Sequence, residues 1–300
     1  MHLSELLQRK KCLFSFEIFP PKKVSDMEAV YQLTASLRQL HPDFISITCG
    51  AGGSAIGDNL TAKIACYIKK EHNIEPLAHL TCVNSSRESV EEVLAYLKAH
   101  HIDNVLALRG DRIQDSTATD FVHASDLVSL IRQKGGFYVA AACHPEGHPE
   151  SRSRTENIRY LQEKVEAGAS HLISQLFFDN EVFYRFADEV RAAHMTIPVE
   201  AGIMPIVNKH LVERIVSLCG ATVPAKFSSI LSRFEDDPAA LFDAGIDYAT
   251  EQIMDLLSFG VPGIHLYTMN NATVAERMTK NIAGALQGVN DDRTHRAVVC

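Results

Sequence analysis

Eight short apolar runs alternate with helical patterns along almost the entire chain of 300 residues, and this alternation restricts the fold more than any other feature. Several of these runs, such as 138–142, are apolar at every position and not only at every second one. Strands of that kind are buried on both faces, as in a parallel sheet covered by helices. The predicted strands span residues 14–18, 44–48, 77–81, 104–108, 138–142, 171–175, 199–203 and 263–267.

The segments between the strands carry helix signals. Capping boxes predict two helix starts, at Ser25–Glu28 and Ser85–Glu88. Asp237, followed by Pro238, predicts the start of another helix, which Gly260 ends.

Eight alternating units without a linker predict a single (β/α)8 TIM barrel, a mixed α/β fold, over residues 1–300. A doubly wound open sheet is the alternative, because the order of strands along the chain is the same in both folds. Two separate domains fit less well, since no composition shift divides the chain.

Charge and cysteine usage restrict the class of protein. Lys and Arg total 29 against 37 Asp and Glu, a net charge of −8, which argues against nucleic-acid or anionic-membrane partners. No apolar run approaches the roughly 18 residues of a membrane span, and the N-terminus lacks the apolar core of a signal peptide. The seven cysteines form no CxxC pair, which indicates reduced thiols and a cytoplasmic protein. Cys49, Cys82 and Cys143 fall near strand ends and could be nucleophiles, although a small buried cysteine is the usual case.

Polar residues follow almost every predicted strand, at the end where barrels carry their active sites. These residues are Glu17, Thr48, His79, Thr81, Arg109, Asp111, His144, His148, Gln175, Tyr267 and Asn270.

Two carboxylates among them suggest chemistry. Glu17 could be salt-bridged at a strand end, but its apolar neighbours Phe16 and Ile18 favour a general acid. Asp111 could pair with Arg109, or it could be a fixed negative charge beside a cationic or redox-active group.

Two motifs favour other chemistry only weakly. The run 50–55 matches a loose GxGxxG dinucleotide pattern, but the next strand ends without the acid that binds a ribose, so we interpret it as a barrel loop. His144 and His148 have the spacing of zinc ligands, but Pro145 and Pro149 prevent the helix that would align them, so no metal site is predicted.

With these residues in place, the chain resembles the 5,10-methylenetetrahydrofolate reductase family. The length is similar to that of the bacterial form, which consists of the catalytic domain alone. The matching segments occur in family order, at 14–22, 47–51, 78–82, 107–111, 123–127, 144–150, 164–169, 175–179, 202–205 and 266–270.

The resemblance implies a (β/α)8 barrel that holds FAD non-covalently at the carboxyl ends of its strands. It also implies a ping-pong reduction of 5,10-methylenetetrahydrofolate to 5-methyltetrahydrofolate, with hydride from NADH or NADPH through FAD, in one-carbon metabolism and methionine biosynthesis. A homo-oligomer is expected, because the family is usually oligomeric.

The same resemblance implies roles for individual residues. Glu17 matches the general acid that protonates N10 of the folate and opens its imidazolidine ring to the 5-iminium cation. Asp111 matches an aspartate near flavin and folate, whose charge disfavours the anionic reduced flavin and stabilises the iminium. Gln175 matches a glutamine that hydrogen-bonds the pterin. The positions expected to contact FAD are Thr48, His79, Arg109, Gly110, Asp111, Ala124, His144, His148, Asn157 and Lys164, with Arg109 and Lys164 suited to its phosphates.

Four positions depart from the family pattern. His144 replaces a tyrosine, Asn157 an aspartate and Lys209 an aromatic residue, and Asn271 stands where an arginine is thought to meet the folate tail of the substrate. Lys209 and Asn271 motivate an alternative, a flavin-bearing subunit that receives electrons from a partner subunit in a larger complex. A flavin-free barrel lyase or methyltransferase is a third reading.

Overall fold

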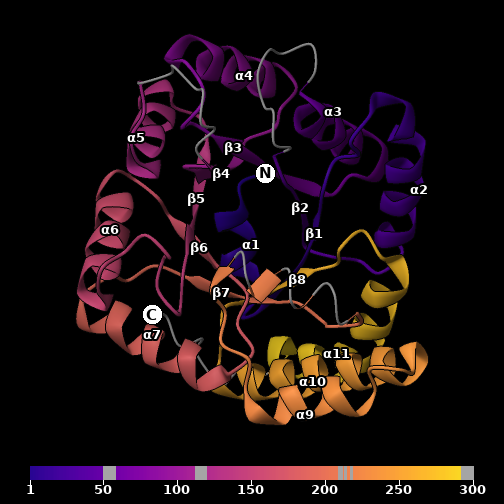
Figure 1. The fold of residues 1–300 in the computed structure, drawn as a ribbon. Helices are drawn as coiled ribbons and strands as arrows, with labels where there is room; N and C mark the ends of the chain where they lie inside the picture. The colour runs from indigo at the N-terminus through magenta and orange to yellow at the C-terminus, as the bar shows by residue number, and fades with distance from the viewer. Residues whose placement is uncertain (50–58, 112–119, 209–211, 213–214, 217–218, 292–300) are drawn as a thin grey trace.

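Eight parallel strands close into a barrel in which every strand pairs with its neighbours in sequence and β1 pairs with β8 (Figure 1). The computed structural model describes residues 1–300 except 50–58, 112–119, 209–211, 213–214, 217–218 and 292–300. The closed order confirms the predicted (β/α)8 barrel and excludes the open sheet. The strands are β1 (Leu13–Ile18), β2 (Phe44–Ile47), β3 (Glu75–Thr81), β4 (Asn104–Leu108), β5 (Tyr138–Cys143), β6 (His171–Ser174), β7 (Val199–Ile203) and β8 (Gly263–Tyr267).

Helices surround the sides of the barrel and cover one of its ends (Figure 1). They are α1 (Leu3–Arg9), the short 3-10 turn η1 (Val24–Asp26), α2 (Met27–Arg38), α3 (Leu60–Tyr67), which continues as η3 (Ile68–His72), α4 (Arg87–Ala99), α5 (Ala124–Lys134), α6 (Arg154–Glu166), α7 (Asn180–Ala192), α9 (Ala225–Arg233), α10 (Pro238–Phe259) and α11 (Ala272–Asp291).

Alternation along each strand separates the barrel interior from the helix-facing core. On β1, Phe14, Phe16 and Ile18 pack in the large cluster shared with the helices. Leu13 instead packs with inward residues of other strands, among them Phe44. Because side chains alternate along a strand, Ser15 and Glu17 share the inward face with Leu13.

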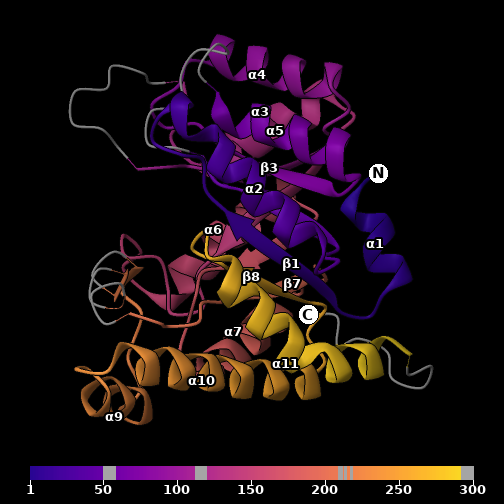
Figure 2. The same cartoon turned by 90° about the vertical axis from the view of Figure 1, so that its right-hand side faces the viewer.

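Helix α1 covers the end of the barrel where the strands begin, which Figure 2 shows on the right. Leu3 is fully buried in the inner cluster, and its N–H donates to Asn104 Oδ1 at 3.0 Å. The strands end at the opposite end of the barrel, called the mouth below, where the predicted functional residues lie.

One predicted helix start and its end are confirmed. The Asp237 carboxylate accepts hydrogen bonds from the N–H groups of Ala239 and Ala240, and Pro238 occupies the first helical position of α10. Gly260 ends the helix with φ of +91°, a conformation that favours glycine.

The two predicted capping boxes are wrong in detail. Ser25 lies inside the 3-10 turn η1 and its hydroxyl donates to Asp26 Oδ1, so it does not cap α2. At α4 the cap is Ser86, whose hydroxyl accepts from Ser89 N–H at 3.1 Å, and not Ser85. In both cases a second polar residue stood beside the expected cap, and local spacing does not decide between adjacent candidates.

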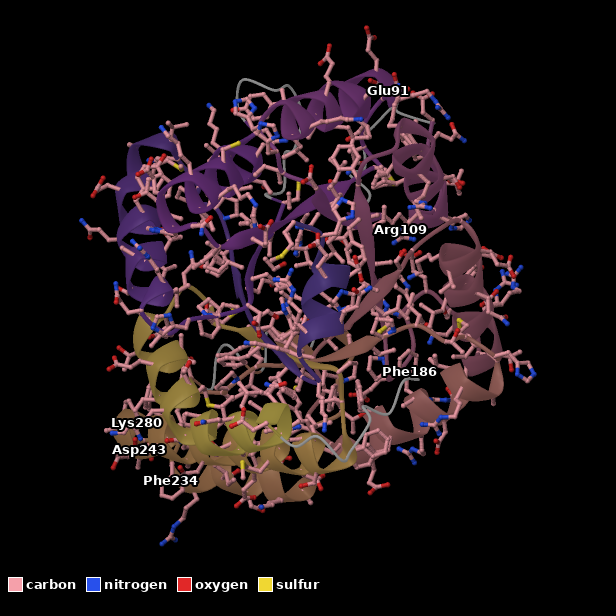
Figure 3. The ribbon with its side chains drawn as sticks, turned by 180° about the vertical axis from the view of Figure 1, so that it is seen from behind. Glu91, Arg109, Phe186, Phe234, Asp243 and Lys280 are labelled. Atoms are coloured by element: carbon pink, nitrogen blue, oxygen red, sulfur yellow. The ribbon has the colours of Figure 1, made fainter. Side chains whose placement is uncertain are left out.

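Charged side chains lie over the outer helices, as Glu91, Asp243 and Lys280 illustrate in Figure 3. Within the described ranges, no helix combines the length and the apolar character that a membrane crossing requires.

Candidate active site

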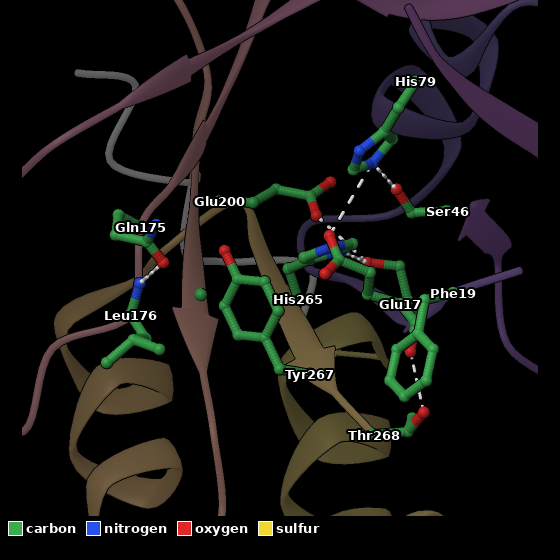
Figure 4. A network of polar contacts seen from close by, with 12 residues as sticks. Glu17, Phe19, Ser46, His79, Gln175, Leu176, Glu200, His265, Tyr267 and Thr268 are labelled. Atoms are coloured by element: carbon green, nitrogen blue, oxygen red, sulfur yellow. Dashed lines mark hydrogen bonds and ion pairs between the residues drawn. The ribbon is translucent and has the colours of Figure 1, made fainter. Parts of the chain in front are cut away.

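Glu17 lies inside the mouth of the barrel, near the end of β1, with its side chain 18% exposed. Its Oε2 is 3.5 Å from His265 Nε2 and 3.6 Å from His79 Nε2, so the carboxyl group lies between two imidazole rings (Figure 4). The backbone carbonyl of Glu17 accepts the hydroxyl of Thr268 at 2.7 Å, which joins the end of β1 to the loop after β8. The carboxyl group is thus placed by three separate segments of the chain.

Both imidazoles are held by serines from the adjacent strands. His79 Nε2 lies 2.6 Å from Ser46 Oγ, and His265 Nδ1 lies 2.7 Å from Ser15 Oγ. Burial lowers the pKa of His79 to about 4, opposed by the charge of Glu17, so this imidazole is neutral at pH 7. A neutral ring can both accept and donate a hydrogen bond beside the carboxyl group.

Ser15, Ser46 and His265 were missed by the sequence reasoning, which considered only residues at the strand ends. Each lies two residues before an expected mouth position, at Glu17, Thr48 or Tyr267, and so belongs to the next inward layer. Counting inward at a period of two from each mouth residue would have found all three.

A basic group lies beyond the ends of β4 and β5. The Arg109 guanidinium forms a two-pronged salt bridge with Glu150, with Nη2 2.8 Å from Oε1. Lys164 reaches in from α6 and donates to the carbonyl of Ala142 at 2.7 Å. Burial lowers the pKa of Lys164.

The loop after β5 lies beside these two cations. Burial lowers the pKa of His144 to about 3, with further contributions from Lys164, His148 and Arg109. The ring centroids of His144 and His148 are 4.8 Å apart, edge to face. The structure therefore brings together four of the residues predicted to bind FAD.

Asn157 positions that loop. Its Oδ1 accepts the N–H of His148 at 3.1 Å, and its Nδ2 donates to the carbonyl of His144 at 3.2 Å. The Asn157 side chain therefore makes backbone contacts within the protein.

Two predicted folate-contacting side chains also make local hydrogen bonds. Gln175 directly follows β6, and its Oε1 accepts the N–H of Leu176 at 2.9 Å. Asn271 precedes α11, and its Oδ1 accepts the N–H of Val274 at 3.2 Å, as a helix cap does.

The remaining predicted site residues lie on the same rim. Thr48 directly follows β2, and its N–H donates to the carbonyl of Ile18. Ala124 is the first residue of α5. Gly110 has φ of +82°, and the exposed Asp111 accepts Asn84 Nδ2 at its carbonyl. The run 50–55 and Lys209 lie outside the described residues.

The environment of Cys82 does not favour a nucleophilic thiol. Burial raises the pKa of Cys82 to about 12, which keeps this thiol protonated at neutral pH. Among the residues that the structure describes, no group of three or more His, Cys, Asp or Glu side chains is placed to hold a metal ion.

The two low histidine pKa values make stability depend on pH. His79 and His144 have pKa values of about 4 and about 3 when folded, whereas an unfolded histidine titrates near 6.5. Below pH 6.5 the unfolded chain therefore binds more protons, and the free energy of unfolding should fall by up to about 1.4 kcal/mol per pH unit for each histidine. Urea unfolding at about pH 6.5 and about pH 5 measures this loss.

The matched variants separate this effect from general acid sensitivity. His144→Asn should reduce the loss, whereas His100→Asn, at an exposed histidine after α4, should leave it unchanged. An undiminished loss in His144→Asn would show that His144 is not responsible.

Known proteins are similar to this one in fold and in sequence. A protein from Clostridium thermocellum, described as binding two copies of 5-methyl-5,6,7,8-tetrahydrofolic acid, superposes with a TM-score of 0.62 over 94% of this chain and 100% of that one. At 12% identity this likeness concerns the fold alone.

The sequence comparisons are more specific. A probable methylenetetrahydrofolate reductase (NADH) of Oryza sativa is 36% identical over 87% of this chain and 46% of its own length. The 5,10-methylenetetrahydrofolate reductase of Pectobacterium carotovorum is 32% identical over 87% of both chains. The chain thus spans about half the length of the plant relatives and most of the bacterial one. The model of the methylenetetrahydrofolate reductase family matches residues 2–283, and the chain belongs to this family.

Proposed function

We propose that this protein reduces 5,10-methylenetetrahydrofolate to 5-methyltetrahydrofolate, with hydride from NADH or NADPH carried by non-covalently bound FAD. The observation that carries the proposal is the inward carboxyl of Glu17, enclosed by His79 and His265 at the mouth of a barrel of this family. Relatives named as NADH-dependent reductases support a nicotinamide donor.

The donor set at the mouth fits FAD. Arg109 and Lys164 provide two cations for a pyrophosphate, and Arg109 presents the planar fork that suits phosphate oxygens. Bound FAD would supply hydride carriage between the nicotinamide and the folate.

The chain's own residues have distinct tasks in this proposal. Glu17 Oε2 holds a proton inside the mouth and delivers it to N10 of the folate, which opens the imidazolidine ring to the 5-iminium cation. Asp111 places a negative charge at the rim, which stabilises that cation. Gln175 presents its amide to the pterin.

The setting of the reaction is part of the same proposal. We propose a catalytic unit over residues 1–300 that acts in the cytoplasm as a homo-oligomer, in one-carbon metabolism and methionine biosynthesis, without nucleic-acid or membrane partners. The net charge of −8 supports the last point.

A flavin-bearing subunit of a larger complex is the alternative. The side chain of Asn271, which stands where a substrate-binding arginine is expected, caps α11. A weaker hold on the folate tail would suit a chain that acts only with a partner.

The absorption spectrum of the purified protein tests the proposal directly. We expect a yellow flavin spectrum that bleaches anaerobically with NADH or NADPH and returns when 5,10-methylenetetrahydrofolate is added. A colourless protein that cannot be reconstituted with FAD would refute it. Bleaching by chemical reductant but by neither nicotinamide would favour the partner-dependent subunit.

Glu150 should compete with FAD for Arg109. The Glu150 carboxylate is 64% exposed and occupies both prongs of the guanidinium, so Glu150→Gln should tighten FAD binding by about two- to fivefold. Quenching of flavin fluorescence on titration measures this affinity. Glu251→Gln breaks a similarly exposed pair, between Glu251 on α10 and Lys226 on α9, and should leave the affinity for FAD unchanged. Weaker binding in Glu150→Gln would mean that Glu150 orients Arg109 for the cofactor.

A further inference from the structure

A fully buried polar cluster lies inside the barrel, directly behind Glu17. It consists of Ser15 on β1, His171 on β6, Glu200 on β7 and His265 on β8, each with no exposed surface. Buried polar side chains lower the stability of the fold unless they form hydrogen bonds or ion pairs with one another or with a neighbouring residue.

The fold makes room for the carboxylate in this cluster. A Cβ atom on Gly263 would lie 2.5 Å from Glu200 Cγ and 2.9 Å from Glu200 Oε1, so the glycine at the start of β8 leaves the space that Glu200 fills. On its other side, Glu200 Oε1 is 3.1 Å from His171 Nε2. Neither of these two atoms has a hydrogen-bond partner among the described residues, so the neighbours of Glu200 Oε2 have to stabilise this buried carboxyl group.

The donors and acceptors around Ser15 indicate which way its hydroxyl points. The hydroxyl has one proton, and two acceptors lie near it, Glu200 Oε2 at 3.3 Å and the carbonyl of Ile264 at 3.5 Å. Neither a carboxylate nor a carbonyl can donate in return. Donation to Glu200 Oε2 gives this buried carboxyl group a hydrogen bond, and the remaining partner, His265 Nδ1 at 2.7 Å, then donates to the serine oxygen.

A neutral imidazole with its proton on Nδ1 has a lone pair on Nε2. In His265 that nitrogen faces Glu17 Oε2 at 3.5 Å, a long contact of the kind that tightens when a substrate binds (Figure 4). A carboxylic-acid proton on Glu17 can be donated to this lone pair, whereas an N–H at the same place would favour the carboxylate.

We propose that Ser15 and Glu200 act as positioning residues that hold His265 in its Nδ1-protonated form. Its Nε2 then accepts a hydrogen bond from the carboxylic acid of Glu17, which keeps the proton on Glu17 until the folate takes it. This inference rests on the acid role of Glu17 in the proposed function. Other groups also face this pair. His79 on β3 lies beside Glu17, and the rings of Phe44 on β2 and Tyr267 on β8 pack against His265. None of them touches His265 Nδ1 in the described contacts, so Ser15 controls the tautomer.

The tautomer can be measured without any turnover. In protein labelled with ¹⁵N-histidine, two-bond ¹⁵N–¹H spectra distinguish Nδ1–H from Nε2–H, and a His265→Gln variant assigns the signal. We expect Nδ1–H in the wild type and in Ser15→Thr, which keeps the hydroxyl, and a shift toward Nε2–H in Ser15→Ala and in Glu200→Gln. Ser46→Ala, the same change beside the other histidine, should leave His265 unchanged. An Nε2–H form in the wild type, or no shift in Ser15→Ala, would overturn the inference.

The rates of the two half-reactions test whether the tautomer matters for function. In Ser15→Ala, the rate of transfer to the folate should fall by about tenfold to a hundredfold while reduction of the flavin by the nicotinamide is unchanged. Ser15→Thr should restore most of the rate. Equal loss in both half-reactions would indicate a merely structural role and overturn the inference. If the wild type transfers no hydride to the folate, the proposed function fails, and the spectra still decide the tautomer.

Discussion

Glu17→Gln should severely slow reduction of the folate while the variant's flavin is still reduced by NADH or NADPH at the wild-type rate. Glutamine keeps the shape and the hydrogen-bonding capacity of the side chain but has no acid proton to give to N10. A positioned general acid contributes about 10²- to 10⁴-fold, and the transfer rate to the folate should fall by that factor. Anaerobic stopped-flow absorbance of the flavin measures the two half-reactions separately.

The control for this variant is Glu92→Gln, at an exposed carboxylate on α4, which should leave both rates unchanged. A Glu17→Gln protein that loses both half-reactions equally would identify Glu17 as a binding or folding residue. A variant that retains folate reduction would mean that another group supplies the proton.

The second large effect concerns the fold. Gly245→Ala on α10 should destabilise the protein by about 3 kcal/mol or more, because overpacking against backbone cannot be relieved by turning a side chain. A Cβ atom on Gly245 would lie 1.6 Å from the carbonyl oxygen of Ile206, in the segment that follows β7 at the mouth. The helix and this segment are in direct backbone contact and would have to separate. Thermal or urea unfolding followed by circular dichroism measures the loss.

The same substitution at Gly284 should change the free energy of unfolding in the opposite direction. Gly284 lies in the interior of α11, and nothing lies within 4 Å of the position that its Cβ would take. Alanine is the better helix former there, so this variant should gain about 0.5–1 kcal/mol. A Gly245→Ala protein as stable as the wild type would show that α10 can move away from the segment after β7 at little cost.

Much of the architecture could be predicted from sequence. The strands at 104–108, 199–203 and 263–267 begin and end where they were predicted to. Strands buried on both faces are mostly apolar, with polar residues only at some positions that face the barrel interior. Such strands can therefore be recognised in the sequence. The errors lay at the ends of elements: β1, β3 and β5 extend beyond their predicted bounds, β2 and β6 stop one residue short, and neither predicted capping serine caps its helix.

Only part of the candidate site could be predicted from the sequence. Glu17 was identifiable because a carboxylate inside an apolar run is unusual at any strand end. The partner of Arg109 was not, because Asp111 is two residues away while Glu150, which forms the salt bridge, is 41 residues away. Asn157 and Asn271 looked like substitutions in a ligand site, and only their backbone contacts show that they support a loop and a helix.

From the sequence alone came the eight strands, the closed barrel as the leading fold and the rim of polar residues, since these depend on local apolar runs and on the polar side chains that follow them. Only the tertiary structure decided which inward side chains meet behind that rim. Ser15 contacts Glu200 and His265 across 185 and 250 residues of chain, and closing β8 against β1 is what brings them together. Such contacts depend on the register between strands, which no local pattern contains.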